Sequence, residues 1–185
     1  MLVMDAMAQI LRKEGIDTMF CFPTTPIIEA AVGAGLRPIV CRQERVGVDM
    51  ASGYARVANG KPPAVFAMQY GPGAENAFPG IASAYSDSVP LLLLPLGHGR
   101  DMSQVYPMFK STRTYESVTK QVEEITLPGE VGHVMRRAFN ALKNGRQGPV
   151  MVETPVDVVK QELAAEPAYQ VVKRTRAAGD PRDIE

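Results

Sequence analysis

Short runs of consecutive apolar residues are the feature that most constrains how this chain can fold. Such runs occupy residues 64–68 and 90–96 and begin the segment 149–154, and each is too short for a helix that is buried on all sides. A strand that is apolar at successive positions must be covered on both faces, which is typical of a parallel sheet between layers of helices. The sequence therefore predicts an α/β fold.

The expected elements alternate along the chain. Strands are predicted at residues 18–22, 38–41, 64–68, 90–96, 117–123 and 149–154, and helices at residues 4–14, 27–35, 44–56, 75–88 and 129–143. This order predicts a three-layer sandwich with a parallel sheet of about six strands, flavodoxin-like in form, with right-handed crossovers. Pro79 falls within a predicted helix and should kink it or mark its first turn.

The last part of the chain has a different character. After residue 162 the periodicity is lost, and charged residues alternate with proline and glycine. We therefore expect one domain over residues 1–162 and a linker over residues 163–185 that leads toward a central domain absent from this chain.

Charge and cysteine content exclude several classes of function. Lys and Arg number 20, as do Asp and Glu, and they are mixed along the chain, so no basic face predicts nucleic-acid or lipid binding. The longest apolar run, VPLLLLPLG, is far shorter than a membrane span, and the first residues do not read as a signal peptide. Two cysteines make no disulfide framework, so we expect a cytoplasmic protein.

Loops that follow the predicted strands are the places where a ligand would bind, because ligands lie beyond the carboxyl ends of parallel strands. The loop QYGPGAEN, residues 69–76, is the most informative of them. Gly71 and Gly73 would let a ligand or a backbone approach closely, and Pro72 stiffens the turn. The loop lacks a phosphate-binding fingerprint, and a purely structural turn is the alternative interpretation.

Four side chains elsewhere could carry chemistry. Glu44 lies at the start of a helix rich in small residues, where a buried charge needs a specific partner or serves only to complement the helix dipole. His98 follows a strand and could transfer a proton, or be an ordinary loop histidine. Cys21 and Cys41 end strands that could be neighbours, and as buried thiols they would be inert. These residues form no metal-binding set.

Five segments in order resemble the N-terminal pyrimidine-binding domain of thiamine-diphosphate-dependent enzymes, the superfamily of acetolactate synthases and 2-oxo acid decarboxylases. The segments are LRKEGIDTMFCFP, CRQERVGVDMASGYARVANGKPPAVF, GPGAENAFPGIASAYSDSVPLLLL, SVTKQVE and NGRQGPVMVETPVDV. They extend over nearly the whole chain. Each is weak alone, and their order and spacing make the resemblance specific.

The resemblance implies a role for several of these residues. Glu44 would be the catalytic glutamate that hydrogen-bonds N1′ of the cofactor's aminopyrimidine and so helps to activate thiazolium C2. The cofactor-binding residues would be Pro23, Glu44, Gly71, Pro72, Gly73 and Asn76. Residues on the substrate side would be Thr24, Thr25, Gln69 and His98.

The implied cofactor is thiamine diphosphate, with Mg²⁺ bound by a pyrophosphate-binding domain that this sequence does not contain. That domain would belong to the same or another chain, and a homodimer is expected. The sequence also departs from the family pattern. Gln43 replaces the usual histidine before the glutamate, and Tyr106, Pro107 and Met108 stand where acetolactate synthases carry Phe-Gln-Glu.

The predicted function is therefore one half of a lyase or transferase that decarboxylates or ligates a 2-oxo acid. We expect the chain alone to be inactive. It would be a piece of a longer enzyme or the small subunit of a two-chain decarboxylase. A non-catalytic binding or assembly domain and a nucleotide-binding domain of the same fold are the alternatives. The substrate, and the choice between decarboxylation and ligation, stay open.

Overall fold

The computed structural model describes residues 1–23, 25–102, 104–175, 178–180 and 182. Its centre is one parallel sheet in the order β2-β1-β3-β4-β6-β5. The strands are β1 (Thr18–Cys21), β2 (Arg37–Val40), β3 (Ala64–Met68), β4 (Leu91–Gly97), β5 (Gln121–Glu124) and β6 (Val150–Pro155). The six-stranded parallel sheet predicted from the apolar runs is thus confirmed.

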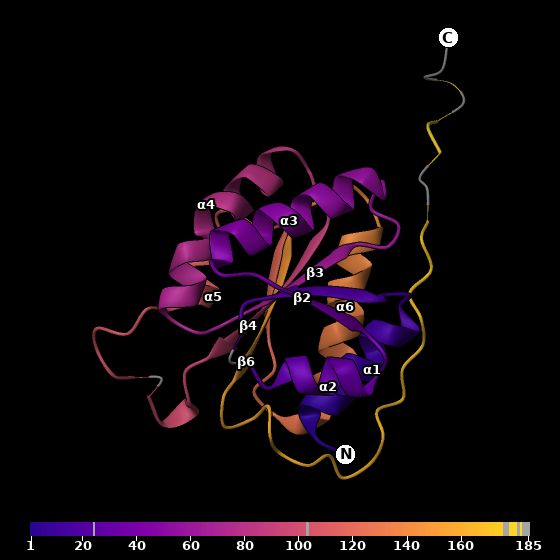
Figure 1. Ribbon diagram of the computed structural model, residues 1–185. Coiled ribbons are helices and arrows are strands. Elements are labelled where there is room, and N and C mark those ends of the chain that lie inside the picture. Colours follow the sequence, from indigo (N-terminus) through magenta and orange to yellow (C-terminus); the bar gives the residue numbers. More distant parts are fainter. Residues whose placement is uncertain (24, 103, 176–177, 181, 183–185) are drawn as a thin grey trace.

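Helices cover both faces of the sheet. They are α1 (Val3–Lys13), α2 (Ile27–Gly33), α3 (Glu44–Val57), α4 (Pro72–Ser86), α5 (Ser111–Tyr115) and α6 (Val131–Lys143), with short 3₁₀ turns η1 (Arg100–Met102) and η2 (Pro128–Glu130). Helices α1, α2 and α6 pack on one face, and α3, α4 and α5 on the other (Figure 1). This arrangement is the three-layer sandwich that the alternation predicts.

Successive residues of the central strands enter the two hydrophobic cores in turn. In β3, Val65 and Ala67 belong to the core under α1, α2 and α6, whereas Phe66 and Met68 belong to the core under α3 and α4. All four are fully buried. Side chains alternate across a strand, so a strand between two helix layers needs apolar residues at every position.

Helix α3 approaches the sheet closely because of one glycine. A Cβ atom added to Gly47 would lie 2.4 Å from Cε2 of Phe66 and 2.6 Å from Sγ of Cys41. Similarly, a Cβ on Gly80 of α4 would lie 2.9 Å from Cγ1 of Val48 on α3. The small residues of α3 and α4 therefore bring these helices against the sheet and against each other.

Two details differ from the sequence-based expectations, and the cysteines agree with them. Strand β5 begins at Gln121, because residues 116–120 form a turn after the short helix Ser111–Tyr115. Helix α4 begins at Pro72, and Pro79 lies inside it rather than in its first turn. As expected, Cys21 and Cys41 are buried free thiols at the ends of neighbouring strands, and their side chains belong to the cores on opposite faces of the sheet. Burial raises the pKa of Cys21 to about 11, so its thiol is unreactive.

The segment after β6 packs back on the domain. Val172 is buried in the core beside α6, and Tyr169 packs against the same core. Glu14, at the end of α1, accepts hydrogen bonds from the Tyr169 hydroxyl, from the backbone N–H of Val172 and from Nζ of Lys143. The first part of the predicted linker is therefore docked, and the boundary at residue 162 stays a prediction.

Candidate active site at the carboxyl edge of the sheet

The residues that the sequence singles out lie on loops at one edge of the sheet. All strands run in the same direction, so the segments after β1, β2, β3 and β4 leave from that edge. Glu44 is the first residue of α3, shortly after β2, and Asn76 lies near the start of α4, after β3. The helices α3 and α4 pack together, which brings these two side chains into contact.

Glu44 is buried and is held by an amide. Its exposed fraction is only 7%, and Nδ2 of Asn76 donates a 2.8 Å hydrogen bond to its Oε2. The neighbouring Arg42 and Arg45 are exposed, and within the described residues neither makes an ion pair with Glu44. A buried carboxylate with a single amide donor keeps acceptor capacity for another group.

Gly73 leaves room beside the other carboxylate oxygen. A Cβ atom at this position would lie 3.0 Å from Oε1 of Glu44 and 3.0 Å from Cβ of Gln69. Gly71, at the start of the same loop, has a φ of +56°, in the region where side chains are strained. Gly71 thus allows the turn, and Gly73 allows the side chains of Glu44 and Gln69 to lie close to the helix start.

His98 belongs to the same edge. Its ring lies 4.8 Å from the ring of Tyr70, centroid to centroid, and a Cβ on Gly71 would lie 3.7 Å from its Nε2. The structure therefore brings Gln69, Gly71 and His98 together around the turn that carries Gly73. Pro72 is exposed at that turn.

The residues after β1 lie apart from this cluster. Pro23 and Thr25 line a separate hollow with Met4, Val40 and Lys160. The Thr25 hydroxyl is buried and has no hydrogen-bond partner among the described residues. Thr24 lies outside the described residues.

Two features of the site were missed by sequence reasoning. Tyr115 of α5 is fully buried and donates a 2.5 Å hydrogen bond to the carbonyl of Ala74, which fixes the first turn of α4 and thereby Asn76. Burial raises the pKa of this phenol. Glu153 is a buried carboxyl in β6 that accepts a hydrogen bond from the Ser111 hydroxyl. A single acidic residue within the apolar run of β6 was the available signal for Glu153.

Two other kinds of feature are absent from the described part of the chain. No cluster of His, Cys, Asp or Glu side chains there has an arrangement that could hold a metal ion. No helix there combines the length and apolar character needed to cross a membrane.

A buried carboxylate beside a glycine turn lies here at the carboxyl edge of a parallel sheet, where α/β domains commonly bind their ligands. Residues 1–123 match the family described as "Thiamine pyrophosphate enzyme, N-terminal TPP binding domain". The chain belongs to this family.

Similar proteins include both decarboxylases and synthases. The "Probable 2-ketoarginine decarboxylase AruI" of Pseudomonas aeruginosa is 29% identical over 177 residues, covering 91% of this chain and 31% of that protein. Acetolactate synthase 3 of Brassica napus is 34% identical over 170 residues, covering 86% of this chain and 25% of that protein. The acetolactate synthase isozyme 2 large subunit of Escherichia coli is 31% identical over 175 residues, covering 88% and 30%. The chain thus spans about a quarter to a third of these relatives.

Proposed function

We propose that this chain supplies the pyrimidine-binding half of a thiamine-diphosphate site in an enzyme that acts on a 2-oxo acid. In this proposal Glu44 is the carboxyl that faces the pyrimidine. The observation that carries the proposal is the buried Glu44, whose Oε2 accepts the 2.8 Å hydrogen bond from Asn76. Its Oε1 faces the side-chain-free Gly73.

The residues present fit a flat, nitrogen-bearing ring. Gly73 has no side chain, and a Cβ there would come within 3.0 Å of Glu44 Oε1, so the glycine lets the carboxylate lie close against the turn. Glu44 is buried, which limits competition from water for its free acceptor position. Gly71, Pro72 and Gly73 would hold the ring from the turn.

Glu44 and Asn76 would divide the work at this site. When bound, thiamine diphosphate supplies the nucleophilic carbon and the electron sink that cleavage or ligation of a 2-oxo acid requires. Asn76 fixes the plane of the Glu44 carboxyl through Oε2, which leaves Oε1 to hold a proton or pass it to the ring nitrogen. His98 and Gln69, on either side of the glycine turn, would face the substrate.

The rest of the enzyme is proposed from the relatives. Two of them are named as acetolactate synthases and one as a 2-ketoarginine decarboxylase, so a 2-oxo acid is the proposed substrate class. A further domain would bind the diphosphate through Mg²⁺, in the same chain or in the partner of a homodimer. The described part of this chain offers no metal-binding cluster for that purpose.

The test replaces Glu44 by glutamine in the full-length enzyme. Glutamine keeps the shape and one hydrogen-bonding position, but it does not exchange a proton at that position. We expect exchange of the cofactor's C2 proton for deuterium to slow by about 10²–10⁴-fold, the usual magnitude of acid–base assistance. Exchange is measured by NMR on acid-quenched samples, with cofactor occupancy and thermal unfolding recorded alongside.

The matched control is Glu75→Gln, which changes an exposed carboxylate in the first turn of α4. This control should leave C2 exchange unchanged. A Glu44→Gln enzyme that binds the cofactor and keeps exchange within a few-fold of the parent would show that Glu44 only begins the helix, and the proposal would fail.

A further inference from the structure

A second cavity adjoins the candidate site on the far side of His98. It has a volume of about 160 Å³ and is lined by His98, Arg100, Met102, Gln104, Met108, Phe109, Lys110, Thr112, Glu124, Glu153 and Pro155. These residues come from the ends of β4, β5 and β6 and from the segment between β4 and α5. Apolar side chains and carboxylates therefore share one small space.

Glu153 is the buried polar group in this cavity. Its exposed fraction is 9%, and the Ser111 hydroxyl donates a hydrogen bond to its Oε2. Its Oε1 accepts no hydrogen bond from the residues that the structure describes, and it lies 2.9 Å from the position of a Cβ on Gly97. Gly97 thus leaves space for this carboxyl at the end of β4.

Glu124 places a second carboxylate next to the first. The two residues are direct partners in the parallel register of β5 and β6, so their side chains project from the same face of the sheet. Glu124 is exposed at the rim of the cavity. Burial, and then the charge of Glu124, raise the pKa of Glu153 to about 8.

The cations that line the cavity do not neutralise this pair. Arg100 is engaged elsewhere: its Nε donates a 2.7 Å hydrogen bond to Asp157, and its Nη1 donates to the carbonyl of Thr126. Lys110 is exposed, and among the described residues it makes no ion pair with either glutamate. His98 completes the titratable groups that face the cavity. Among the described residues, therefore, no cation is paired with Glu153 or Glu124, and both carboxyls are open to a partner.

We propose that this cavity binds the positively charged end of a small organic molecule, a guanidinium or primary ammonium group, with Glu153 and Glu124 as its partners. Met102, Met108 and Phe109 would contact the methylene groups that carry the charge. Because His98 also borders the glycine turn of the candidate site, the molecule would be the substrate of the proposed enzyme. In that respect the inference rests on the proposed function, and it adds that the 2-oxo acid carries a cationic side chain.

Binding of such a cation depends on pH through Glu153. Below its raised pKa the carboxyl is protonated, so pairing with a cation requires loss of that proton. A guanidinium stays charged up to a pH of about 12. Affinity should therefore rise by about tenfold per pH unit below the pKa of Glu153 and level off above it. The plateau should begin near pH 8, where this carboxyl titrates.

The test is a binding titration with the chain as it stands, so it needs neither cofactor nor turnover. The probes are 4-guanidinobutanoate and its uncharged analogue 4-ureidobutanoate, which have nearly the same shape. Binding is followed by NMR of the methionine methyl groups. We expect shifts at Met102 and Met108 but not at Met50 of α3, and affinity for the guanidino compound at least about tenfold higher, as for charge-assisted hydrogen bonds.

Substitutions locate the effect. Glu153→Gln should remove both the preference for the guanidino compound and its pH dependence. Glu124→Gln changes an exposed residue and should shift the pH dependence to lower pH. The matched control Glu116→Gln removes an exposed carboxylate just after α5 and should change nothing. The two variants provide independent tests should one of them fold poorly.

Equal affinities for the two probes in the parent would overturn the inference, as would an unchanged guanidino preference in Glu153→Gln. Neither result would bear on cofactor activation by Glu44, which the C2 exchange measurement tests separately. Conversely, unchanged C2 exchange in Glu44→Gln would count against the role of Glu44 without deciding whether the cation binds.

Discussion

Gly73 shapes the candidate site through the side chain that it lacks. In a helix, glycine is less favourable than alanine by about 1 kcal/mol, so a glycine in the first turn of α4 needs a reason. The reason at this position is contact: a Cβ would press on both Oε1 of Glu44 and Cβ of Gln69 at 3.0 Å. The glycine therefore lowers helix propensity but lets the Glu44 carboxylate and Gln69 lie close to the start of α4.

The substitution Gly73→Ala tests this account. The gain in helix propensity and the crowding oppose each other, so the free energy of unfolding should change by less than about 1 kcal/mol. Glu44 should be displaced, and C2 proton exchange in the full-length enzyme should slow by about 10- to 100-fold. Thermal unfolding and the exchange experiment measure the two effects.

Gly53 provides the matched control within α3. It is exposed, and a Cβ there would have no atom within 4 Å. Gly53→Ala should raise the free energy of unfolding by about 0.5–1 kcal/mol and leave C2 exchange unchanged. Equal exchange rates in Gly73→Ala and Gly53→Ala would show that Gly73 does not govern the carboxylate.

At the scale of elements, the seating of α3 on the sheet decides where Glu44 lies. The helix reaches β3 because Gly47 has no side chain to hold it away from Phe66. It packs closely on α4 because Gly80 of that helix has no side chain to hold Val48 away. The position of the site thus depends on helix packing at Gly47 and Gly80, one turn further along α3 and α4 than Glu44 and Asn76.

We predict that Gly47→Ala destabilises the protein although alanine is the better helix former. The added methyl group would lie 2.4 Å from Phe66 and 2.6 Å from Cys41, so the helix or the ring must move. Overpacking of this kind costs about 1–3 kcal/mol. Urea unfolding, compared with Gly53→Ala in the same helix, gives the difference. An unfolding free energy equal to that of the parent would mean that α3 is loosely seated.

The residue composition of each element determines how well the sequence predicts it. Strands β3, β4 and β6 were found because burial on both faces requires apolar residues in succession. Strand β5 has the sequence QVEE and lies at an edge of the sheet, so its start was misplaced. Helix α5 has only five residues and no amphipathic period to detect.

The same distinction separates the parts of the candidate site that the sequence predicts from those that it does not. Glu44 and the turn at Gly71 and Gly73 follow directly from strands that the pattern locates, so their common edge could be predicted. The cavity around Glu153 could not, because Ser111 and Phe109 belong to an irregular segment whose position depends on contacts between distant parts of the chain. Periodicity holds no information on such contacts.

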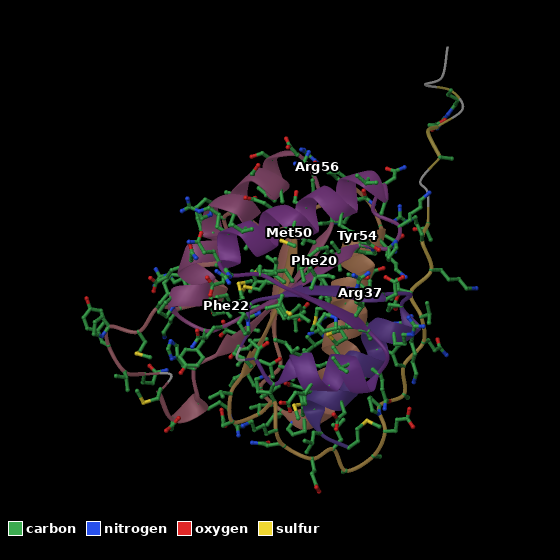
Figure 2. The ribbon with its side chains drawn as sticks, in the orientation of Figure 1. Phe20, Phe22, Arg37, Met50, Tyr54 and Arg56 are labelled. Atoms are coloured by element: carbon green, nitrogen blue, oxygen red, sulfur yellow. The ribbon has the colours of Figure 1, made fainter. Side chains whose placement is uncertain are left out.

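At the scale of the whole molecule, apolar side chains remain exposed on the layer formed by α3 and α4. They are Val46, Met50, Val57 and Tyr85. Figure 2 shows Met50 and Tyr54 on α3, on the same side of the molecule as Phe20 and Phe22 of the β1 segment. Most of the small residues of these helices, by contrast, are buried by packing within the chain. Contact with a second copy would therefore use the larger side chains.

We predict that the chain self-associates through α3 and α4, as a two-fold dimer. Clustered apolar side chains on an exposed helix pair are typical of an interface. Sedimentation equilibrium should show a monomer–dimer equilibrium at micromolar concentrations. Val57→Lys, at a position that is 91% exposed, should weaken dimer formation without loss of fold. A chain that is monomeric at every concentration tested would refute this prediction.

The strand order has a consequence for how the protein is made. The neighbours β2, β1, β3 and β4 are complete once residue 97 has been synthesised, so most of the sheet can form while the ribosome still extends the chain. Strand β5 is synthesised next, but among the described elements it pairs only with β6. It must therefore wait about 25 residues for its partner, which then inserts between β4 and β5. The contact of Glu44 with Asn76 needs only residues made before β5, whereas the cavity around Glu153 needs β6 as well.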